Sequence, residues 1–285
     1  MSIIQAIVLG IIQGLTEFLP VSSTAHLVVI PRLVGWTSSA EFTSAMESFD
    51  VALHVGTLFA VILCFWKDWV DLIKNGFKLV FDKKFKEEKD KNKEHKKDYK
   101  TGKMFWYIVA ATIPGGIIGY LLDKFLGEKL QSNTTVIAFA LIILGIILYI
   151  VDKYGKNKKK MEDMTIKDSL IIGISQCLAF IPGVSRSGIT ITTARKLDID
   201  RESAAKFSFL LSTPIIFGAA ILKVKDFQFD QLFFYVGVLV SFVVGLLAIK
   251  FMLKHLQKSD YKIFAIYRVL FGLIILLTFG FKLIS

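Results

Sequence analysis

Long apolar runs alternate with short polar segments along this chain, and the lengths of the runs predict membrane-spanning helices. The segments VIAFALIILGIILYIV (136–151) and LFFYVGVLVSFVVGLLAI (232–249) are long enough to cross a hydrocarbon core of about 30 Å, because an α-helix rises about 1.5 Å per residue. Six spans are predicted, at 49–66, 104–122, 134–151, 203–222, 232–250 and 263–281. We therefore expect an all-α polytopic membrane protein, with residues 1–285 forming one integral membrane domain.

Two further apolar segments are interrupted by polar residues and are too short to span the membrane alone. The first, residues 2–30, contains EFLPVSSTAH and breaks at Pro20. The second, residues 169–197, contains PGVSRSGIT and breaks at Pro182, with a second short helix expected from about Gly188. Irregular backbone persists at membrane depth only where it is buried in protein or lines a wet cavity. Each segment is therefore predicted to be a re-entrant helix–loop–helix hairpin.

The two interrupted segments resemble each other in sequence. LGIIQGLTEFLPVSS (9–23) aligns with IGISQCLAFIPGVSR (172–186), and a weaker match places Phe49 and Leu53 over Phe207 and Leu211. The chain is therefore predicted to consist of two repeats, each a re-entrant hairpin plus three transmembrane helices, in the halves 1–151 and 169–285. Because each repeat has an odd number of spans, the two must be inverted relative to each other in the membrane.

Composition agrees with a membrane protein, and the distribution of charge predicts its orientation. Hydrophobic residues make up 54% of the chain, and its net charge of +11 is concentrated in the lysine-rich loops 82–103 and 152–168. The positive-inside rule places these loops in the cytoplasm and both termini outside. The loops show no pattern of interleaved aromatic residues that would support RNA binding, so no nucleic-acid partner is expected. Cys64 and Cys177 lie in separate apolar segments and are expected to be core residues rather than a disulfide or metal pair.

The two polar segments predict one anion-binding site. Inverted symmetry would bring the hairpin tips together, so that two helix N-termini present free backbone N–H groups and positive dipole ends to an anion. Arg186 adds a planar guanidinium suited to phosphate oxygens. Glu17 and His26 add acid–base or metal-ligand capacity, and Ser23 is a candidate nucleophile.

Several neighbouring residues have a structural interpretation beside the functional one. Helix capping is the main role expected of four residues at the tips, Ser22, Thr24, Ser185 and Ser187. Asp50 and His54 either line the pocket or take no part in it, and the sequence favours neither. Arg268 lies close to a predicted cytoplasmic helix end, so its side chain is expected to reach the aqueous phase by snorkelling.

At these motifs the chain resembles a known family. QGLTEFLPVSSTAH (13–26) is similar to the (E/Q)xxxE-plus-PxSST motif, and PGVSRSGIT (182–190) to the PGxSRSGxT motif, of the bacterial undecaprenyl-diphosphate phosphatase family of bacitracin-resistance proteins. The resemblance runs essentially end to end and includes FAIYR (264–268). It implies removal of the terminal phosphate of undecaprenyl diphosphate at the outer face of the bacterial cell membrane, with Mg²⁺ or Ca²⁺ assisting. This reaction recycles the lipid carrier of cell-wall synthesis and confers bacitracin resistance.

The resemblance also implies roles for individual residues. Glu17 is the second acid of the first motif and would act in catalysis, with metal binding as a further role. Ser23 and His26 match the proposed catalytic pair, and Arg186 matches the phosphate-binding arginine. Seven remaining motif residues are assigned to substrate binding: Gln13, Ser22, Thr24, Ser185, Ser187, Gly188 and Thr190. Position 13 is Gln where some members have Glu, which weakens any scheme that needs two carboxylates there.

Alternatives stay open for both the chemistry and the function. Attack by Ser23 or His26 through a phospho-enzyme and direct attack by metal-bound water both fit the residues. The rival function is a prenyl-phosphate lipid carrier, because inverted repeats with an anion site at the midplane suit alternating access. A membrane acid phosphatase is not supported, since no SRxxxxxHxxxD motif follows Ser185. The preferred ion, the prenyl chain length and the oligomeric state, including a homodimer, stay open.

Overall fold

The protein is built from helices. The computed structural model describes residues 1–126 and 133–279, and no β-strand occurs within these ranges. The six long helices are α3 (Ala40–Cys64), α6 (Lys93–Leu126), α7 (Thr134–Tyr154), α10 (Arg201–Lys223), α11 (Leu232–Leu256) and α12 (Lys262–Phe279). Each of the six predicted spans falls on one of these helices, although the end of the last span, beyond residue 279, lies outside the described residues. The all-α fold class is confirmed.

Five of these helices, α6, α7, α10, α11 and α12, are long and apolar enough to cross a membrane. The helix α3 bends by 43° between Ala40–Met46 and Ser48–Cys64, and it adds a sixth span if its two parts are counted together. The chain is therefore a multi-pass membrane protein.

Both interrupted segments form short helices separated by a break, as the sequence predicts. The pieces are α1 (Ile3–Phe18) and α2 (Ser23–Leu33) in the first segment, and α8 (Ile166–Ser175), the 3₁₀ helix η4 (Gln176–Phe180) and α9 (Arg186–Lys196) in the second. A proline follows the end of the preceding helix by two residues in each break, where it disfavours continuation of the helix because it lacks a backbone N–H and its ring clashes with the preceding turn. The second helix of the second segment begins at Arg186 rather than at Gly188.

The same capping geometry starts the returning helix of each segment. Ser22 and Ser185 are the N-cap residues of α2 and α9, with φ angles of 73° and 71°. Their hydroxyls accept hydrogen bonds from the backbone N–H groups of Ala25 (3.4 Å) and Gly188 (3.1 Å). A left-handed backbone at a residue other than glycine costs about 1–3 kcal/mol, so the surrounding structure must hold both breaks in place.

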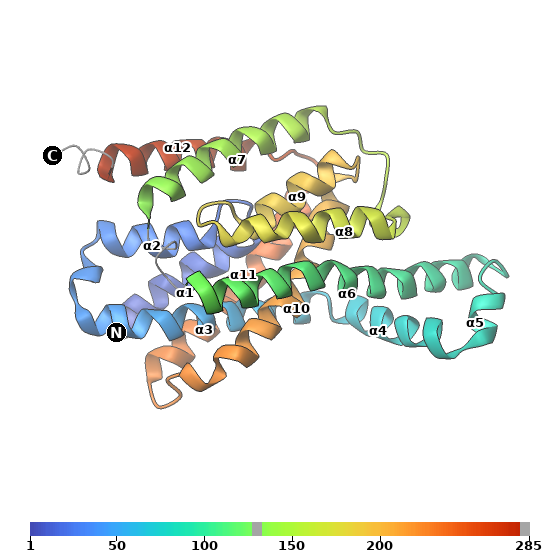
Figure 1. The fold of residues 1–285 in the computed structure, drawn as a ribbon, viewed down its shortest axis with the longest axis horizontal. Helices are drawn as coiled ribbons and strands as arrows, with labels where there is room; N and C mark the ends of the chain where they lie inside the picture. Colours follow the sequence, from blue (N-terminus) through green and yellow to red (C-terminus); the bar gives the residue numbers. More distant parts are fainter. Residues whose placement is uncertain (127–132, 280–285) are drawn as a thin grey trace.

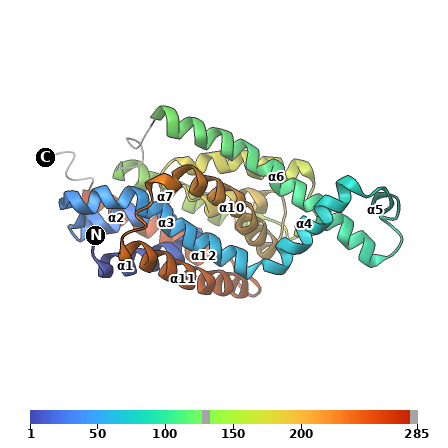
Figure 2. The same ribbon diagram turned by 90° about the horizontal axis from the view of Figure 1, so that it is seen from below.

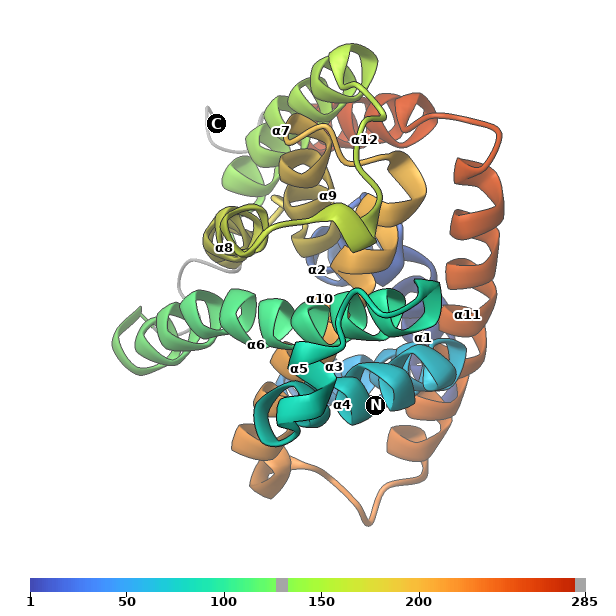
Figure 3. The same cartoon turned by 90° about the vertical axis from the view of Figure 1, so that its right-hand side faces the viewer.

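Helix packing follows a similar pattern in the two halves. The first hairpin packs through α1 against α11, and the second hairpin packs through α8 against α6. The helices α7 and α12 pack against each other, as do α3 and α10. In the view of Figure 3, α7, α9 and α12 are grouped at the top, and α11 runs along the right-hand edge beside α1. These paired contacts are those expected of two related units.

The ends of the molecule differ in character. Figure 1 shows the N-terminus and the end of α12 on the left, whereas α4 (Trp66–Phe81), α5 (Lys83–Glu87) and the start of α6 extend to the right. Figure 2 shows the same extension from below. The helices α1 and α2 lie toward the left-hand end, and α8 begins nearer the right-hand end. Opposite entry of the hairpins would fit inverted repeats, but the inverted repeat itself stays a prediction.

Glycines let the hairpins approach the bundle closely. A Cβ at Gly14 of α1 would lie 2.7 Å from the Cβ of Val244 in α11. A Cβ at Gly173 of α8 would lie 2.3 Å from the carbonyl oxygen of Ala111 in α6. Both distances are too short for a side chain, so the close contact of each hairpin with its partner helix depends on glycine.

A buried ion-pair network joins the ends of four helices. Asp152 of α7 accepts hydrogen bonds from Arg195 Nε of α9 (2.7 Å) and Arg201 Nε of α10 (2.9 Å). Its other oxygen accepts from the backbone N–H of Tyr261, just before α12, at 3.1 Å. Asp152 and Arg195 are almost fully buried. The carboxylate therefore holds the ends of these helices together.

Candidate active site

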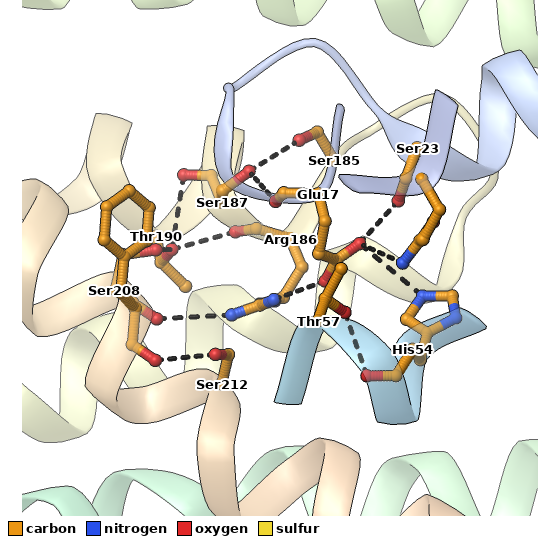
Figure 4. A network of polar contacts seen from close by, with 12 residues as sticks. Glu17, Ser23, His54, Thr57, Ser185, Arg186, Ser187, Thr190, Ser208 and Ser212 are labelled. Carbon is orange, nitrogen blue, oxygen red and sulfur yellow. Dashed lines mark hydrogen bonds and ion pairs between the residues drawn. The ribbon is translucent and has the colours of Figure 1, made fainter. Parts of the chain in front are cut away.

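The tips of the two hairpins meet at an ion pair. Glu17 lies at the end of α1, and Arg186 is the first residue of α9. Arg186 Nη2 donates to Glu17 Oε1 at 2.5 Å (Figure 4), and the two side chains are 14% and 6% exposed. The structure thus brings together the acid of the first motif and the arginine of the second, although 168 residues separate them in the chain.

The second oxygen of the Glu17 carboxylate has three partners from three helices. Ser23 Oγ, at the start of α2, donates to Oε2 at 2.7 Å, and Gln13 Nε2, one turn earlier in α1, donates at 3.2 Å. His54 Nε2 of α3 lies 3.5 Å from the same oxygen. The acid therefore lies between a guanidinium, a hydroxyl, an amide and an imidazole. Gln13 is fully buried, and its Oε1 has no hydrogen-bond partner among the described residues.

Serine side chains connect the two breaks to each other. Ser187 Oγ in α9 donates to the backbone carbonyls of Glu17 (3.1 Å) and Leu19 (3.2 Å) and contacts Ser185 Oγ at 3.2 Å. Ser22 and Ser185 are helix caps, as expected, whereas Ser187 links one hairpin to the other instead of capping its own. Thr24 lies half-buried in the first turn of α2. The site is therefore held by contacts between the hairpins.

The helix α10 contributes hydroxyl groups that the sequence did not single out. Arg186 Nη1 donates to the carbonyl oxygen of Ser208 at 3.2 Å, and Ser208 Oγ lies 2.7 Å from Thr190 Oγ1. Ser212, one turn further along α10, is drawn beside them in Figure 4. The sequence did contain a signal for these two serines. The weak repeat match that aligns Phe49 with Phe207 also aligns Asp50 with Ser208 and His54 with Ser212.

His54 lines the site, which resolves the alternative that the sequence left open. Its Nδ1 lies 2.8 Å from the carbonyl oxygen of Asp50, and its Nε2 points to Glu17, as Figure 4 shows. The Asp50 carboxylate is 3.9 Å from Nδ1 and is 42% exposed. The helix α3 therefore adds a second carboxylate and an imidazole at the accessible side of the Glu17 carboxylate.

His26 is held by partners outside this cluster. Its Nδ1 lies 2.7 Å from the carbonyl oxygen of Ser22, and its Nε2 lies 2.7 Å from the hydroxyl of Tyr267 in α12. The ring also stacks on Phe271 at a centroid distance of 4.4 Å. A carbonyl only accepts, so Nδ1 carries the proton and a neutral ring accepts the Tyr267 hydroxyl at Nε2. A catalytic role for His26 stays a prediction.

Arg268 is buried at the back of both breaks, so the expectation that it snorkels to water was wrong. Its side chain has no exposed area. Its nitrogens donate to the carbonyls of Pro20 in the first break (3.1 Å) and of Gly183 (3.0 Å) and Val184 (2.9 Å) in the second. The breaks leave these carbonyls without helical partners, and the guanidinium satisfies them. A Cβ at Gly188 would lie 2.5 Å from Arg268 Nη1, so the glycine makes room for the arginine.

The side chains of the candidate site do not by themselves form a metal site within the described ranges. No group of three or more His, Cys, Asp or Glu side chains that could hold a metal ion occurs there. Glu17, with Asp50 nearby, offers the carboxylates of the site. Mg²⁺ is typically bound by one or two carboxylates together with substrate phosphates. The residues therefore fit an ion that arrives with a phosphate ligand, and metal binding by Glu17 stays a prediction.

Known proteins resemble this chain along nearly its whole length. The family profile described as bacitracin resistance protein BacA matches residues 6–274. A protein of Desulforudis audaxviator named undecaprenyl-diphosphatase is 45% identical over 274 residues, which cover 95% of this chain and 96% of that protein. Proteins of the same name from Moorella thermoacetica and Caldicellulosiruptor bescii are 42% and 44% identical, over 99% and 97% of this chain and 100% and 97% of their own lengths. The chain therefore belongs to the bacitracin resistance protein BacA family.

Proposed function

We propose that this protein hydrolyses undecaprenyl diphosphate to undecaprenyl phosphate and inorganic phosphate. The observation that carries the proposal is the cluster of Glu17, Arg186 and Ser23 at the meeting point of two helix N-termini inside a membrane protein. The name undecaprenyl-diphosphatase, given to relatives that match the whole chain, supports the same activity. In this proposal the bilayer holds the prenyl chain, which is why the phosphatase is built within the membrane.

Charge neutralisation is the main requirement for this reaction. A diphosphate carries several negative charges, and phosphoryl transfer depends more on positioning and electrostatic stabilisation than on covalent chemistry by the protein. The N-termini of α2 and α9 supply backbone N–H groups and positive dipole ends. Arg186 adds a guanidinium whose orientation is fixed by Glu17 and by the carbonyl of Ser208. These groups would bind the terminal phosphate.

The geometry favours Ser23 over His26 as the protein nucleophile. Ser23 Oγ donates to the Glu17 carboxylate at 2.7 Å, so this acid is placed to take the proton as the oxygen attacks phosphorus. A bond from Ser23 Oγ to the terminal phosphorus would form as the bond to the bridging oxygen breaks, with undecaprenyl phosphate as the leaving group. Water would then cleave the phosphoserine and release inorganic phosphate. Direct attack by water, with Glu17 accepting its proton, is the competing route.

A divalent cation is part of the proposal as a companion of the substrate. Mg²⁺ or Ca²⁺ bound to the diphosphate and held by Glu17 would supply further charge neutralisation. The protein groups would still bind and orient the phosphate, because Arg186 and the helix N-termini are present without it.

The proposed orientation places the site toward the outer face of the bacterial plasma membrane. The lysine-rich residues 82–103 lie at the end that carries α5, opposite the N-terminus in Figure 1. The positive-inside rule puts that end in the cytoplasm. The lipid substrate would then reach the site from the outer leaflet.

Phosphate release by purified protein in detergent tests the function. The substrates are undecaprenyl diphosphate and shorter prenyl diphosphates, each with and without Mg²⁺ or Ca²⁺, and the Glu17→Gln variant is the matched control. Release by wild type only is the expected result. A lipid carrier, which the relatives' names do not favour, needs two compartments and would release no phosphate in detergent. Lipid movement across vesicles without phosphate release would replace the phosphatase proposal with the carrier.

A further inference from the structure

The helix α4 carries an apolar stripe whose side chains are largely exposed, although the Phe77 ring contacts Phe105 of α6 at a centroid distance of 6.1 Å. The stripe consists of residues spaced by three or four positions, which places them on one face: Trp66, Val70, Ile73, Phe77 and Phe81. Their exposed fractions range from 44% to 78%. The face that packs against α6 is a different one and contains Leu72 and Gly76. The extension in Figure 2 therefore has one face joined to the bundle and one apolar face left open.

The stripe continues a surface that faces lipid. Trp66, its first residue, lines an apolar groove together with Phe59 and Leu63 of α3 and Tyr235 and Leu239 of α11. The helix α11 is a membrane-span candidate, and α3 is one when its two parts are counted together. An apolar groove of the helices that can span the membrane therefore lies directly beside the start of α4.

The position of α4 along the membrane normal follows from its contact with α6. Trp106 Nε1 donates to the carbonyl oxygen of Gly76 at 3.0 Å, which sets the middle of α4 beside residue 106. Residues 104–122 of α6 contain no charged side chain, and the two helices run in opposite directions (Figure 1). The part of α4 before Gly76 therefore lies beside the uncharged part of α6. At about 1.5 Å per residue, Trp66 lies roughly 15 Å from Gly76 along the axis of α4, toward the middle of α6.

Lysines form one edge of the stripe. Lys67, Lys74 and Lys78 lie on a common side of α4 together with one acid, Asp71, and the following helix α5 adds Lys83 and Lys84, so this edge has a net positive charge. Long lysine side chains bury their methylene groups against apolar surface and extend the ammonium group to the membrane interface. Each lysine close to an anionic membrane surface contributes about 1 kcal/mol of attraction.

We infer that α4 is a partly embedded membrane helix and that its apolar stripe and lysine edge bind phospholipid in the leaflet beside α5. The first part of the stripe, from Trp66 to Ile73, contacts lipid chains. Phe77 and Phe81 lie at the level of the headgroups, where Lys74 and Lys78 of α4 and Lys83 and Lys84 of α5 bind anionic lipid. The extension formed by α4 and α5 is thus attached to the bilayer and is not a free arm in water. This inference is independent of the proposed phosphatase activity.

Spin-label accessibility in nanodiscs that hold one copy of the protein tests the depth of α4. Labels are placed by Val70→Cys and Phe77→Cys in a protein whose Cys64 and Cys177 are replaced by serine. The matched controls are Phe139→Cys, exposed on the span α7, and Lys91→Cys, exposed between α5 and α6. The label at Val70 is expected to have a ratio of oxygen to nickel-chelate accessibility like that of Phe139, several-fold above that of Lys91. The label at Phe77 is expected to have a ratio between those of Val70 and Lys91. A ratio equal to that of Lys91 places the stripe in water and overturns the inference.

Anionic lipid tests the lysine edge separately. The thermal midpoint of the protein is measured in phosphatidylcholine nanodiscs with and without phosphatidylglycerol. We expect phosphatidylglycerol to raise this midpoint, and we expect the rise to shrink in a variant that combines Lys74→Gln, Lys78→Gln and Lys83→Gln. The control has the same charge loss in the turn between α5 and α6 and at the first residue of α6, through Lys89→Gln, Lys91→Gln and Lys93→Gln. An equal reduction in both variants, or no effect of phosphatidylglycerol, contradicts headgroup binding at this edge.

Discussion

The guanidinium of Arg186 lies 2.5 Å from the carboxylate of Glu17, and each residue belongs to the broken tip of a different hairpin. Further hydrogen bonds hold both side chains in these rotamers. Ser23 donates to the Glu17 carboxylate, and Arg186 donates to the carbonyl of Ser208. The two tips therefore act as one preorganised unit. A phosphate that enters must replace part of this contact, so both residues report on the same ligand.

Replacing the carboxylate should remove catalysis while leaving the fold intact. In Glu17→Gln, the single amide oxygen can accept from Arg186 or from Ser23 but not from both, and the side chain can no longer take a proton or neutralise the guanidinium. Loss of general base catalysis costs about 10²–10⁴-fold, so we expect kcat/KM for phosphate release to fall at least 100-fold. Thermal unfolding of the variant is the control for folding. Activity within about tenfold of wild type, some 1.4 kcal/mol, would remove Glu17 from the mechanism.

Arg186 and Ser23 should show strong energetic coupling. Both donate to the carboxylate of Glu17, to different oxygens, and both would contact the same phosphate. We expect Arg186→Lys to remain severely impaired because it keeps the charge and loses the planar fork, and Arg186→Ala to be worse. The kcat/KM values of Arg186→Ala, Ser23→Ala and the double variant give the coupling. If the two losses simply add, the hairpin tips act separately.

Helix lengths and breaks could be predicted from the sequence because they depend on local patterns. Apolar runs set the six spans, and the prolines with their following serines set the two breaks. The alignment of the halves also predicted that Glu17 and Arg186 would meet. The spans and breaks need only the length of a run or the chemistry of neighbouring residues, whereas the meeting of the tips needs the repeat. The structure contains the helices, the breaks and the contact between Glu17 and Arg186.

The residues that the sequence did not identify depend on which face of a helix is turned inward. Arg268 was assigned to the surface from its position near a helix end, yet packing of α12 against α7 directs it to both breaks. Ser208 and Ser212 appear unremarkable in an apolar span until α10 is placed against α9. His26, which the family resemblance pairs with Ser23, is turned by α2 toward Tyr267, and its catalytic role stays a prediction. Such orientations follow from tertiary contacts, which a single sequence does not encode in an obvious pattern.

Arg268 should be required for the geometry of both breaks. Arg268→Lys keeps the positive charge, but an ammonium cannot reach carbonyls of Pro20, Gly183 and Val184 together. Hydrogen bonds to charged groups are worth about 1.5–3 kcal/mol each, so the loss of two should destabilise the protein by about 3 kcal/mol or more. The exposed Leu270 on the same helix provides the control Leu270→Ala, which should change stability by less than about 1 kcal/mol. Equal thermal midpoints for both variants would contradict the bridging role.

Cysteine labelling should establish the orientation. In a protein whose native cysteines are replaced by serine, Asn92→Cys lies in the lysine-rich region and Ser38→Cys lies between α2 and α3. In intact cells an impermeant thiol reagent should modify the cysteine at position 38 and spare the one at position 92, which should react only after the membrane is opened. The reverse pattern would place the α5 end outside and would move the proposed site away from the outer leaflet.

The buried network at Asp152 should be a major source of stability. Asp152→Asn removes the charge that faces Arg195, which is fully buried, and Arg201. Removing one partner of a buried ion pair leaves an uncompensated charge and costs about 3–5 kcal/mol. Asp198→Asn is the matched control, because that carboxylate is 34% exposed and pairs with Lys158 at 3.7 Å. Asparagine also tolerates the left-handed backbone of residue 198, so the control should lose less than about 1 kcal/mol. Thermal unfolding in detergent compares the two variants directly, and a similar loss in both would show that Asp152 does not hold the four helix ends together.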